Sequence, residues 1–151
     1  MHQGATNIGK LQPQLYQATI TMSEQAGAAA LDSGLEPGFV EVLRIRVSQL
    51  NGCGFCLRMH TRDALAEGES AERIAVLPAW RETEYFDDLE REALALAERV
   101  TRIASSPGDE RDEPITVLSP AQAAAVAWVA IVINSFNRIA ITSHYRIAPH
   151  G

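Results

Sequence analysis

The chain has 151 residues, of which 46% are hydrophobic and 21% are charged, and its formal net charge is −6. This length is enough for one domain that buries its own core, so we expect a single domain over residues 1–151. Its lysines and arginines are dispersed rather than clustered. The sequence therefore lacks the basic surface that binding to nucleic acid or to an anionic membrane requires, and neither is an expected partner.

The cellular compartment follows from the N-terminus and from cysteine usage. Residues 1–7 contain no basic segment followed by an apolar stretch, so no signal peptide is predicted. The most apolar run, residues 121–133, is too short to span a bilayer. Two cysteines in a chain without an export signal favour a reducing compartment, and we expect a cytoplasmic protein.

Apolar residues recur with helical period in almost every segment of the chain. Ser70 and Ser119 are of the type that caps helix N-termini, and Gly34 and Gly68 are suited to helix ends. Asp87 or Asp88 begins a strongly amphipathic segment. The predicted helices span, in chain order, residues 14–31, 37–50, 53–67, 71–77, 88–103 and about 120–144.

Strand patterns are almost absent from the sequence. The one strand-like run, residues 115–118, is short, and the polar segment 105–113 is expected to be an exposed loop. These patterns predict an all-α fold. The last predicted helix is apolar on most faces, which in so small a domain indicates burial against another chain. We therefore expect a homo-oligomer.

The chemistry of the chain is concentrated in the segment NGCGFCLRMH at residues 51–60, which holds both cysteines, Cys53 and Cys56. Two thiols at this spacing can close a small disulfide or share a metal ion. In a helix, Cys53, Cys56 and His60 lie on one face, so His60 can serve as a base or as a third ligand. Glu41, in the preceding predicted helix, can orient His60 or join a proton relay if the two helices pack together.

Three interpretations of this segment stay open on the residues alone. In the first, a cysteine thiolate attacks a peroxide or a disulfide, with its pKa lowered by the helix N-terminus and its proton accepted by His60. In the second, Cys53, Cys56 and His60 bind zinc, although these three ligands leave a structural site one short. In the third, the two cysteines simply pack in a core. No glycine-rich phosphate loop is present, so no nucleotide or other cofactor is expected.

The pattern Glu41, Ser48, Asn51, Cys53, Cys56 and His60 resembles the signature of the AhpD-like alkyl hydroperoxidases, which belong to the carboxymuconolactone decarboxylase superfamily. This resemblance implies an all-α, AhpD-like helical bundle that assembles as a trimer or a hexamer. It also implies that Cys56 attacks the peroxide, Cys53 resolves the product, and Glu41 and His60 form the proton relay. Helix position alone favours Cys53 as the nucleophile, whereas the spacing to His60 favours Cys56.

The resemblance implies a thiol-dependent alkyl hydroperoxide reductase, with a hydroperoxide as substrate and a dithiol or a disulfide reductase as electron donor. The chain departs from the peroxidase pattern at Phe55, where well-studied members carry a further relay histidine. The intact cysteine pair argues against the decarboxylase activity of the superfamily, which does not depend on it. The alternatives are a disulfide reductase or redox sensor that uses the same dithiol, and a non-enzymatic zinc-binding or scaffold protein.

Overall fold

The structure is a computed structural model that describes residues 6–105 and 113–149. Within these ranges the chain forms helices and turns and no strand, which confirms the predicted all-α fold. The predicted loop at 105–113 is exposed at both of its described ends, and residues 106–112 lie outside the described ranges. The helices are α1 (Ile8–Leu11), α2 (Pro13–Asp32), α3 (Pro37–Asn51), α4 (Gly54–Ala66), α5 (Ala71–Val76), the 3-10 helix η1 (Leu77–Glu82), α6 (Asp88–Thr101) and α8 (Pro120–Thr142).

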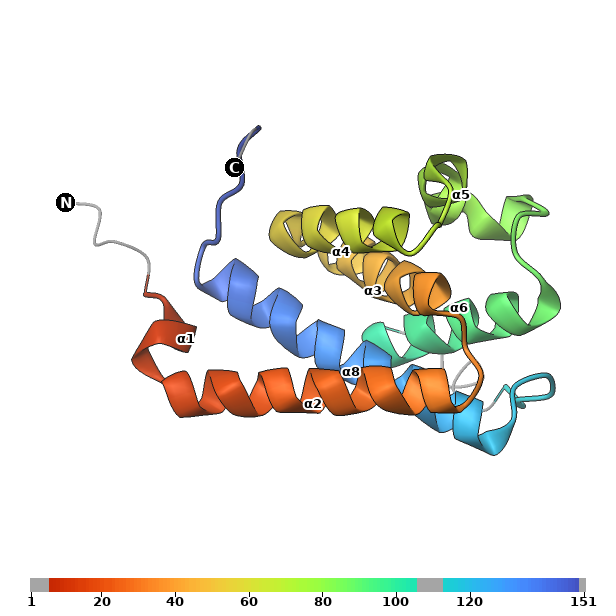
Figure 1. The fold of residues 1–151 in the computed structure, drawn as a ribbon, viewed down its shortest axis with the longest axis horizontal. Coiled ribbons are helices and arrows are strands. Elements are labelled where there is room, and N and C mark those ends of the chain that lie inside the picture. The colour runs from red at the N-terminus through yellow and green to blue at the C-terminus, as the bar shows by residue number, and fades with distance from the viewer. Residues whose placement is uncertain (1–5, 106–112, 150–151) are drawn as a thin grey trace.

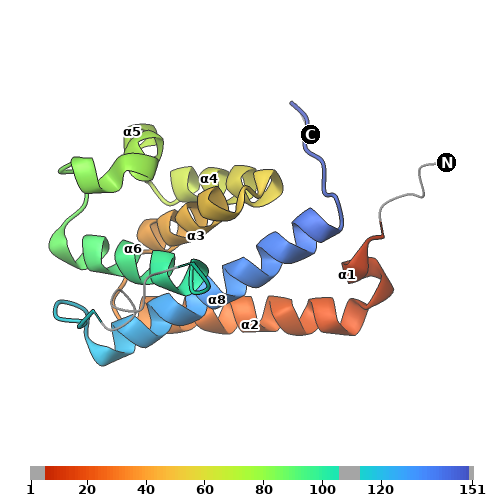
Figure 2. The same cartoon turned by 180° about the vertical axis from the view of Figure 1, so that it is seen from behind.

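Helix α8 is the centre of the bundle, and it packs against α2 on one side and against α3 and α6 on the other. Figures 1 and 2 show it passing between α2 and the α3–α4 pair, with α1 and the C-terminal tail at the same end of the molecule. By length and composition α8 could also cross a membrane. In the structure, α8 packs against α2, α3 and α6, and 44% of its most apolar window is buried.

The turn between α3 and α4 sets the geometry on which the site depends. Gly52 ends α3 in the left-handed conformation, with φ of 68°, which glycine adopts without steric cost. Its N–H and that of Cys53 bond back to carbonyls of the last turn of α3. The chain therefore reverses at once, and α4 packs closely along α3. This juxtaposition is the one that the relay of Glu41 and His60 requires.

Predicted helix starts agree with the structure. Ser119 and Asp87 form reciprocal capping boxes with Gln122 and Glu90, and Ser70 Oγ accepts a hydrogen bond from the first turn of α5. These side chains satisfy backbone N–H groups that have no partner within their helices.

The structure also contains elements that the sequence did not predict. Helix α1 is only one turn long, and after α5 the chain continues as the separate 3-10 helix η1, which contains Pro78. Pro78 occupies the first turn of η1, where a missing N–H leaves no bond unmade. The strand-like residues 115–118 pair with no strand in the described ranges. The N–H groups of Thr116, Val117 and Leu118 instead donate hydrogen bonds to the Glu92 carboxylate.

A buried carboxylate joins three elements in the core. Glu98 of α6 accepts hydrogen bonds from Arg46 Nε of α3 at 2.8 Å, from Trp80 Nε1 of η1 at 2.8 Å and from Arg81 at 2.7 Å. A buried charge is tolerated when its oxygens are paired in this way. The network joins α3 and η1 to α6, and none of its four residues lines the cavity that contains Cys56.

Candidate active site

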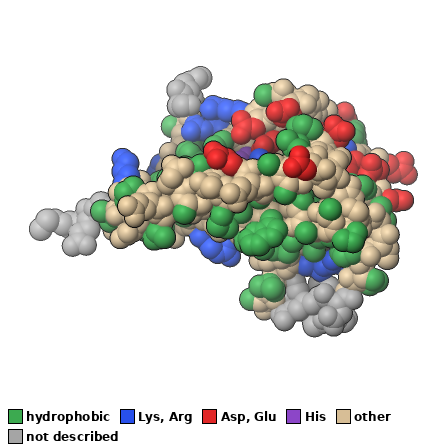
Figure 3. All heavy atoms as spheres, turned by 60° about the horizontal axis from the view of Figure 1, so that its bottom comes forward, with side chains coloured by type: hydrophobic (Ala, Val, Ile, Leu, Met, Phe, Trp, Pro, Cys, Tyr) green, Lys and Arg blue, Asp and Glu red, His purple; other side chains and the backbone are tan. Residues whose placement is uncertain are grey.

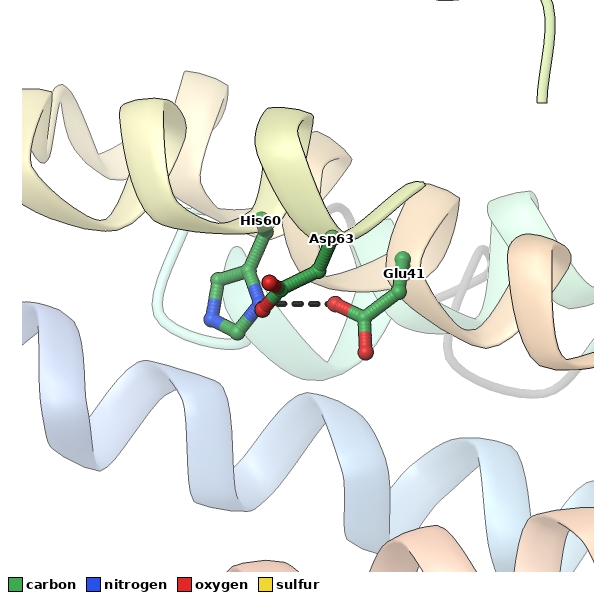
Figure 4. Close-up of side chains that lie close together, drawn as sticks. All are labelled: Glu41, His60 and Asp63. Atoms are coloured by element: carbon green, nitrogen blue, oxygen red, sulfur yellow. Dashed lines mark hydrogen bonds and ion pairs between the residues drawn. The ribbon is translucent and has the colours of Figure 1, made fainter. Parts of the chain in front are cut away.

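The structure places Glu41 beside His60, as the sequence predicted. His60 projects from α4, and its Nδ1 lies 2.7 Å from Glu41 Oε2 on α3 (Figure 4). Arg44 donates a hydrogen bond to the other oxygen of the same carboxylate at 2.5 Å. Burial alone raises the pKa of Glu41, but the hydrogen bond with His60 and the charge of Arg44 outweigh it and hold that pKa below its usual value. Glu41 is therefore ionised at neutral pH.

The proton on His60 follows from its partner. An ionised carboxylate only accepts hydrogen bonds, so neutral His60 carries its proton on Nδ1 and leaves Nε2 as an acceptor. The ring is mostly buried, with an exposed fraction of 8%, and it lies on the wall of a cavity. The pair has the form of a general base whose tautomer is fixed by a carboxylate.

The two cysteines lie at the N-terminus of α4. Cys53 is the N-cap residue, and its Sγ accepts a hydrogen bond from the N–H of Cys56 at 3.4 Å. Both are free thiols, with exposed fractions of 0% and 1%. The predicted helix start at about Cys53 is therefore confirmed.

Burial dominates the acidity of Cys56. Desolvation and the hydrogen bond with the Cys53 thiol raise the pKa of Cys56 to about 12, against a smaller lowering effect of the Asn137 side chain. The prediction of a lowered pKa is wrong for this thiol, because burial outweighs the hydrogen bonds of the Asn137 side chain and of the backbone, which lower the pKa. At neutral pH the Cys56 thiol is protonated at rest, so its proton must be removed as it reacts.

Asn137 of α8 connects the thiols to the rest of the core. It is fully buried, donates a hydrogen bond to Ser48 Oγ at 3.0 Å and accepts one from Asn51 at 2.9 Å. Its side chain also hydrogen-bonds Cys56. In the sequence, Asn137 is a polar residue within an otherwise apolar helix, far along the chain from the cysteines.

Cys56 and His60 share the wall of a cavity of about 280 Å³ between α2, α4 and α8. Its surface is mostly apolar, which suits the carbon chain of an organic substrate. Tyr16 and Tyr145 also line it, and neither was identified from the sequence because they lie far from the cysteine motif along the chain. The apolar lining includes Ile20, Met59, Val129, Val132, Ile133 and Phe136.

A different set of side chains has the spacing of a metal site. One ligand atom each from Glu41, His60 and Asp63 lies within 4.8 Å of the others (Figure 4). Neither cysteine belongs to this cluster. Among the described residues, the three ligands predicted for zinc, Cys53, Cys56 and His60, therefore do not form a cluster with the spacing of a metal site. Arg44 already neutralises Glu41, which makes the cluster a poor site for a divalent cation.

Comparisons with known proteins show to which family the sequence and the fold of this chain are similar. The model of the family described as "Carboxymuconolactone decarboxylase family" matches residues 13–99, more than half of the chain. The uncharacterized protein YdfG of Bacillus subtilis (strain 168) is 39% identical over 110 residues, which cover 72% of this chain and 75% of that protein. A crystal structure from Agrobacterium tumefaciens superposes with a TM-score of 0.81 and 27% identity, over 97% of this chain and 99% of the other. It is described as a protein of unknown function and a candidate antioxidant defence protein AhpD.

Proposed function

This chain is an AhpD-like member of the carboxymuconolactone decarboxylase superfamily, and we propose that it is a thiol-dependent reductase of organic hydroperoxides. One observation carries the proposal: the Cys56 thiol opens onto an apolar cavity whose wall also holds His60, and His60 is paired with Glu41. The site therefore combines a nucleophile and a base with a cavity that can hold an organic substrate.

The proposed reaction begins with removal of the Cys56 proton by His60 Nε2, while Glu41 stabilises the imidazolium that forms. Cys56 Sγ attacks the terminal oxygen of the hydroperoxide, the O–O bond breaks, and the alcohol leaves once it is protonated. Cys56 is then a sulfenic acid. The Cys53 thiol attacks it, water leaves, and a disulfide forms. An external dithiol or a disulfide reductase reduces this disulfide and restores both thiols.

The proximity of the two sulfur atoms supports Cys53 as the resolving residue. Cys53 caps the helix on which Cys56 lies, and its Sγ already accepts the hydrogen bond from the Cys56 N–H. Cys56, not Cys53, lines the cavity. The assignment of Cys56 as the attacking thiol rests on this difference in access together with the family pattern.

Two substitutions test the assignment. Cys56→Ser should abolish oxidation by cumene hydroperoxide. Cys53→Ser should let a sulfenic acid accumulate on Cys56, detected as a covalent adduct with dimedone by mass spectrometry. If both variants turn over at the wild-type rate, the dithiol has no part in the reaction.

A disulfide reductase is the second candidate, and Phe55 in the position of the relay histidine favours it. The raised pKa of Cys56 slows attack on a peroxide and on a disulfide alike, so it does not separate the two functions. Rates of thiol oxidation by cumene hydroperoxide and by a small model disulfide, measured on the same reduced protein, separate the two functions. Faster reaction with the hydroperoxide supports the peroxidase. Stoichiometric zinc in the purified protein, lost on either Cys→Ser substitution, would instead support a metal-binding protein.

A further inference from the structure

The tail that follows α8 folds back onto the first turn of α4. Helix α8 ends at Thr142, and His144 reverses the chain with a positive φ of 54°. Arg58 of α4 donates a hydrogen bond to the Ala148 carbonyl at 3.1 Å, and the Ile147 side chain lies over Gly54. The tail is therefore fixed directly above the cysteine motif.

This course brings Tyr145 to the cavity. Its N–H bonds to the Ala140 carbonyl at 2.9 Å, and its ring packs edge-on against Phe55 with ring centres 5.1 Å apart. Phe55 directly precedes Cys56 and occupies the position of the relay histidine in the peroxidases. The ring of Tyr145, which carries a hydroxyl group, therefore packs against Phe55, at the position where the peroxidases have the relay histidine.

Tyr16 reaches the same cavity from α2. Its ring packs edge-on against Phe136 of α8, with ring centres 6.1 Å apart. Gly9 of α1 lies beneath the ring so closely that a Cβ there would be 3.0 Å from Tyr16 Cδ2. The Ile8 N–H donates to Ser143 Oγ at 3.2 Å, which joins α1 to the end of α8. The short helix α1 therefore fixes the orientation of Tyr16.

Both hydroxyls are available as donors. Within the described residues neither of them is engaged in a hydrogen bond, and both side chains line the cavity together with Cys56. Burial, and then the charges of Tyr145 and Cys56, raise the pKa of Tyr16. The Tyr16 hydroxyl accordingly stays protonated near neutral pH, as a hydrogen-bond donor must.

We propose that the hydroxyls of Tyr16 and Tyr145 hydrogen-bond the leaving oxygen of the hydroperoxide and are the catalytic donors that compensate for Phe55. The inference rests on the proposed function. As Cys56 Sγ takes the terminal oxygen, the electron pair of the O–O bond moves to the other oxygen, which becomes an alkoxide. A tyrosine donates its proton to that oxygen and gives the alcohol. The phenolate is then reprotonated by the imidazolium of His60, directly or through water, so the proton taken from Cys56 reaches the product.

Two peroxides with different leaving groups test this role. Cumene hydroperoxide expels an alkoxide that needs a proton, whereas peracetic acid expels acetate, which is stable without one. Tyr16→Phe and Tyr145→Phe should each slow single-turnover oxidation of Cys56 by cumene hydroperoxide roughly tenfold, and slow oxidation by peracetic acid less than about threefold. Tyr85→Phe is the matched control, because Tyr85 is 40% exposed and does not line the cavity.

The ratio of the two rates is measured within each variant, so a partial loss of folded protein cancels. An unchanged ratio, with both rates lowered equally or neither lowered, would overturn the role of the tyrosines. The proposed function would survive that result if the wild-type protein reacts with cumene hydroperoxide. A wild-type protein that reacts with neither peroxide would remove the proposed function and this inference together.

Discussion

The surroundings of the Cys56 thiol act on its pKa in opposite directions. Burial and the Cys53 thiol favour the protonated form, and Asn137 favours the thiolate. With a pKa of about 12, only a minute fraction of Cys56 is ionised at neutral pH. Reactivity toward a small alkylating reagent therefore depends on how much thiolate the solution pH supplies.

The alkylation rate of Cys56 by iodoacetamide should rise throughout the range from about pH 7 to pH 10, by close to tenfold per unit. The sign follows from the direction of the shift, because a raised pKa leaves the reactive thiolate scarce until the solution becomes strongly alkaline. Peptide mapping of the modified protein resolves Cys56 from Cys53. An alkylation rate of Cys56 that stops rising below pH 8 would contradict the raised pKa of this thiol.

His60→Gln should slow oxidation of Cys56 by cumene hydroperoxide roughly 100-fold at neutral pH, because no group then takes the proton during attack. Glu41→Gln should cost less, since it removes only the partner that orients His60 and stabilises its charge. Arg62→Gln, on the exposed side of α4, is the control and should leave the rate unchanged. Wild-type rates in His60→Gln would exclude a base role for His60.

Among the elements, the segment that leads into α8 depends on one side chain of α6. Glu92 accepts hydrogen bonds from the N–H groups of Thr116, Val117 and Leu118 at 2.8, 2.8 and 2.6 Å. Burial alone would raise the pKa of Glu92, but these hydrogen bonds outweigh it and lower that pKa to about 2. The carboxylate takes the place of the neighbouring strand that such a segment would otherwise need.

Glu92→Gln should lower the free energy of unfolding at neutral pH by roughly 1 kcal/mol, a value kept small because the group is partly exposed and screened by solvent. A lowered folded-state pKa contributes stability above the ordinary value of 4.5, and this contribution is lost as the pH falls toward 2. The difference in melting temperature between Glu92→Gln and wild type should therefore shrink over that interval. If the difference in melting temperature stays constant over this pH range, the loss of stability comes from packing and not from the charge of Glu92.

Local signals predicted most of the helices because caps, prolines and apolar period act within a few residues of one another. Ser119 and Gly52 are examples, since each specifies its own backbone geometry. The one-turn helix α1 and the binding of residues 116–118 by Glu92 depend on contacts with distant segments, and no local pattern encodes them.

In the site, the pairing of Glu41 with His60 was predictable from their spacing and from a short turn. The burial of Cys56 beneath α8 was not, and it reverses the expected direction of its pKa shift.

For the whole molecule, the face formed by α2 and α8 is rich in exposed apolar side chains (Figure 3). Trp128 and Ile131 of α8 are 53% and 40% exposed. Exposed apolar side chains gathered on one face are typical of a contact between protein chains. This face supports the prediction that the protein is a homo-oligomer.

Trp128→Glu should shift the native mass of the protein toward the monomer at micromolar concentration, because a charge in an apolar contact between chains loses its hydration without gaining a partner. Leu65→Glu is the matched control, since Leu65 is an exposed leucine on α4 outside this face. Analytical ultracentrifugation measures both variants. A wild-type protein that is already monomeric would contradict the predicted assembly.

The most direct test of the central claim is a count of free thiols on the reduced protein before and after one equivalent of cumene hydroperoxide. We expect the rapid loss of both thiols, Cys53 and Cys56, from each chain, their return on addition of a dithiol, and no loss of Cys53 in Cys56→Ser. Two thiols that persist unreacted in the wild-type protein would contradict the peroxidase function.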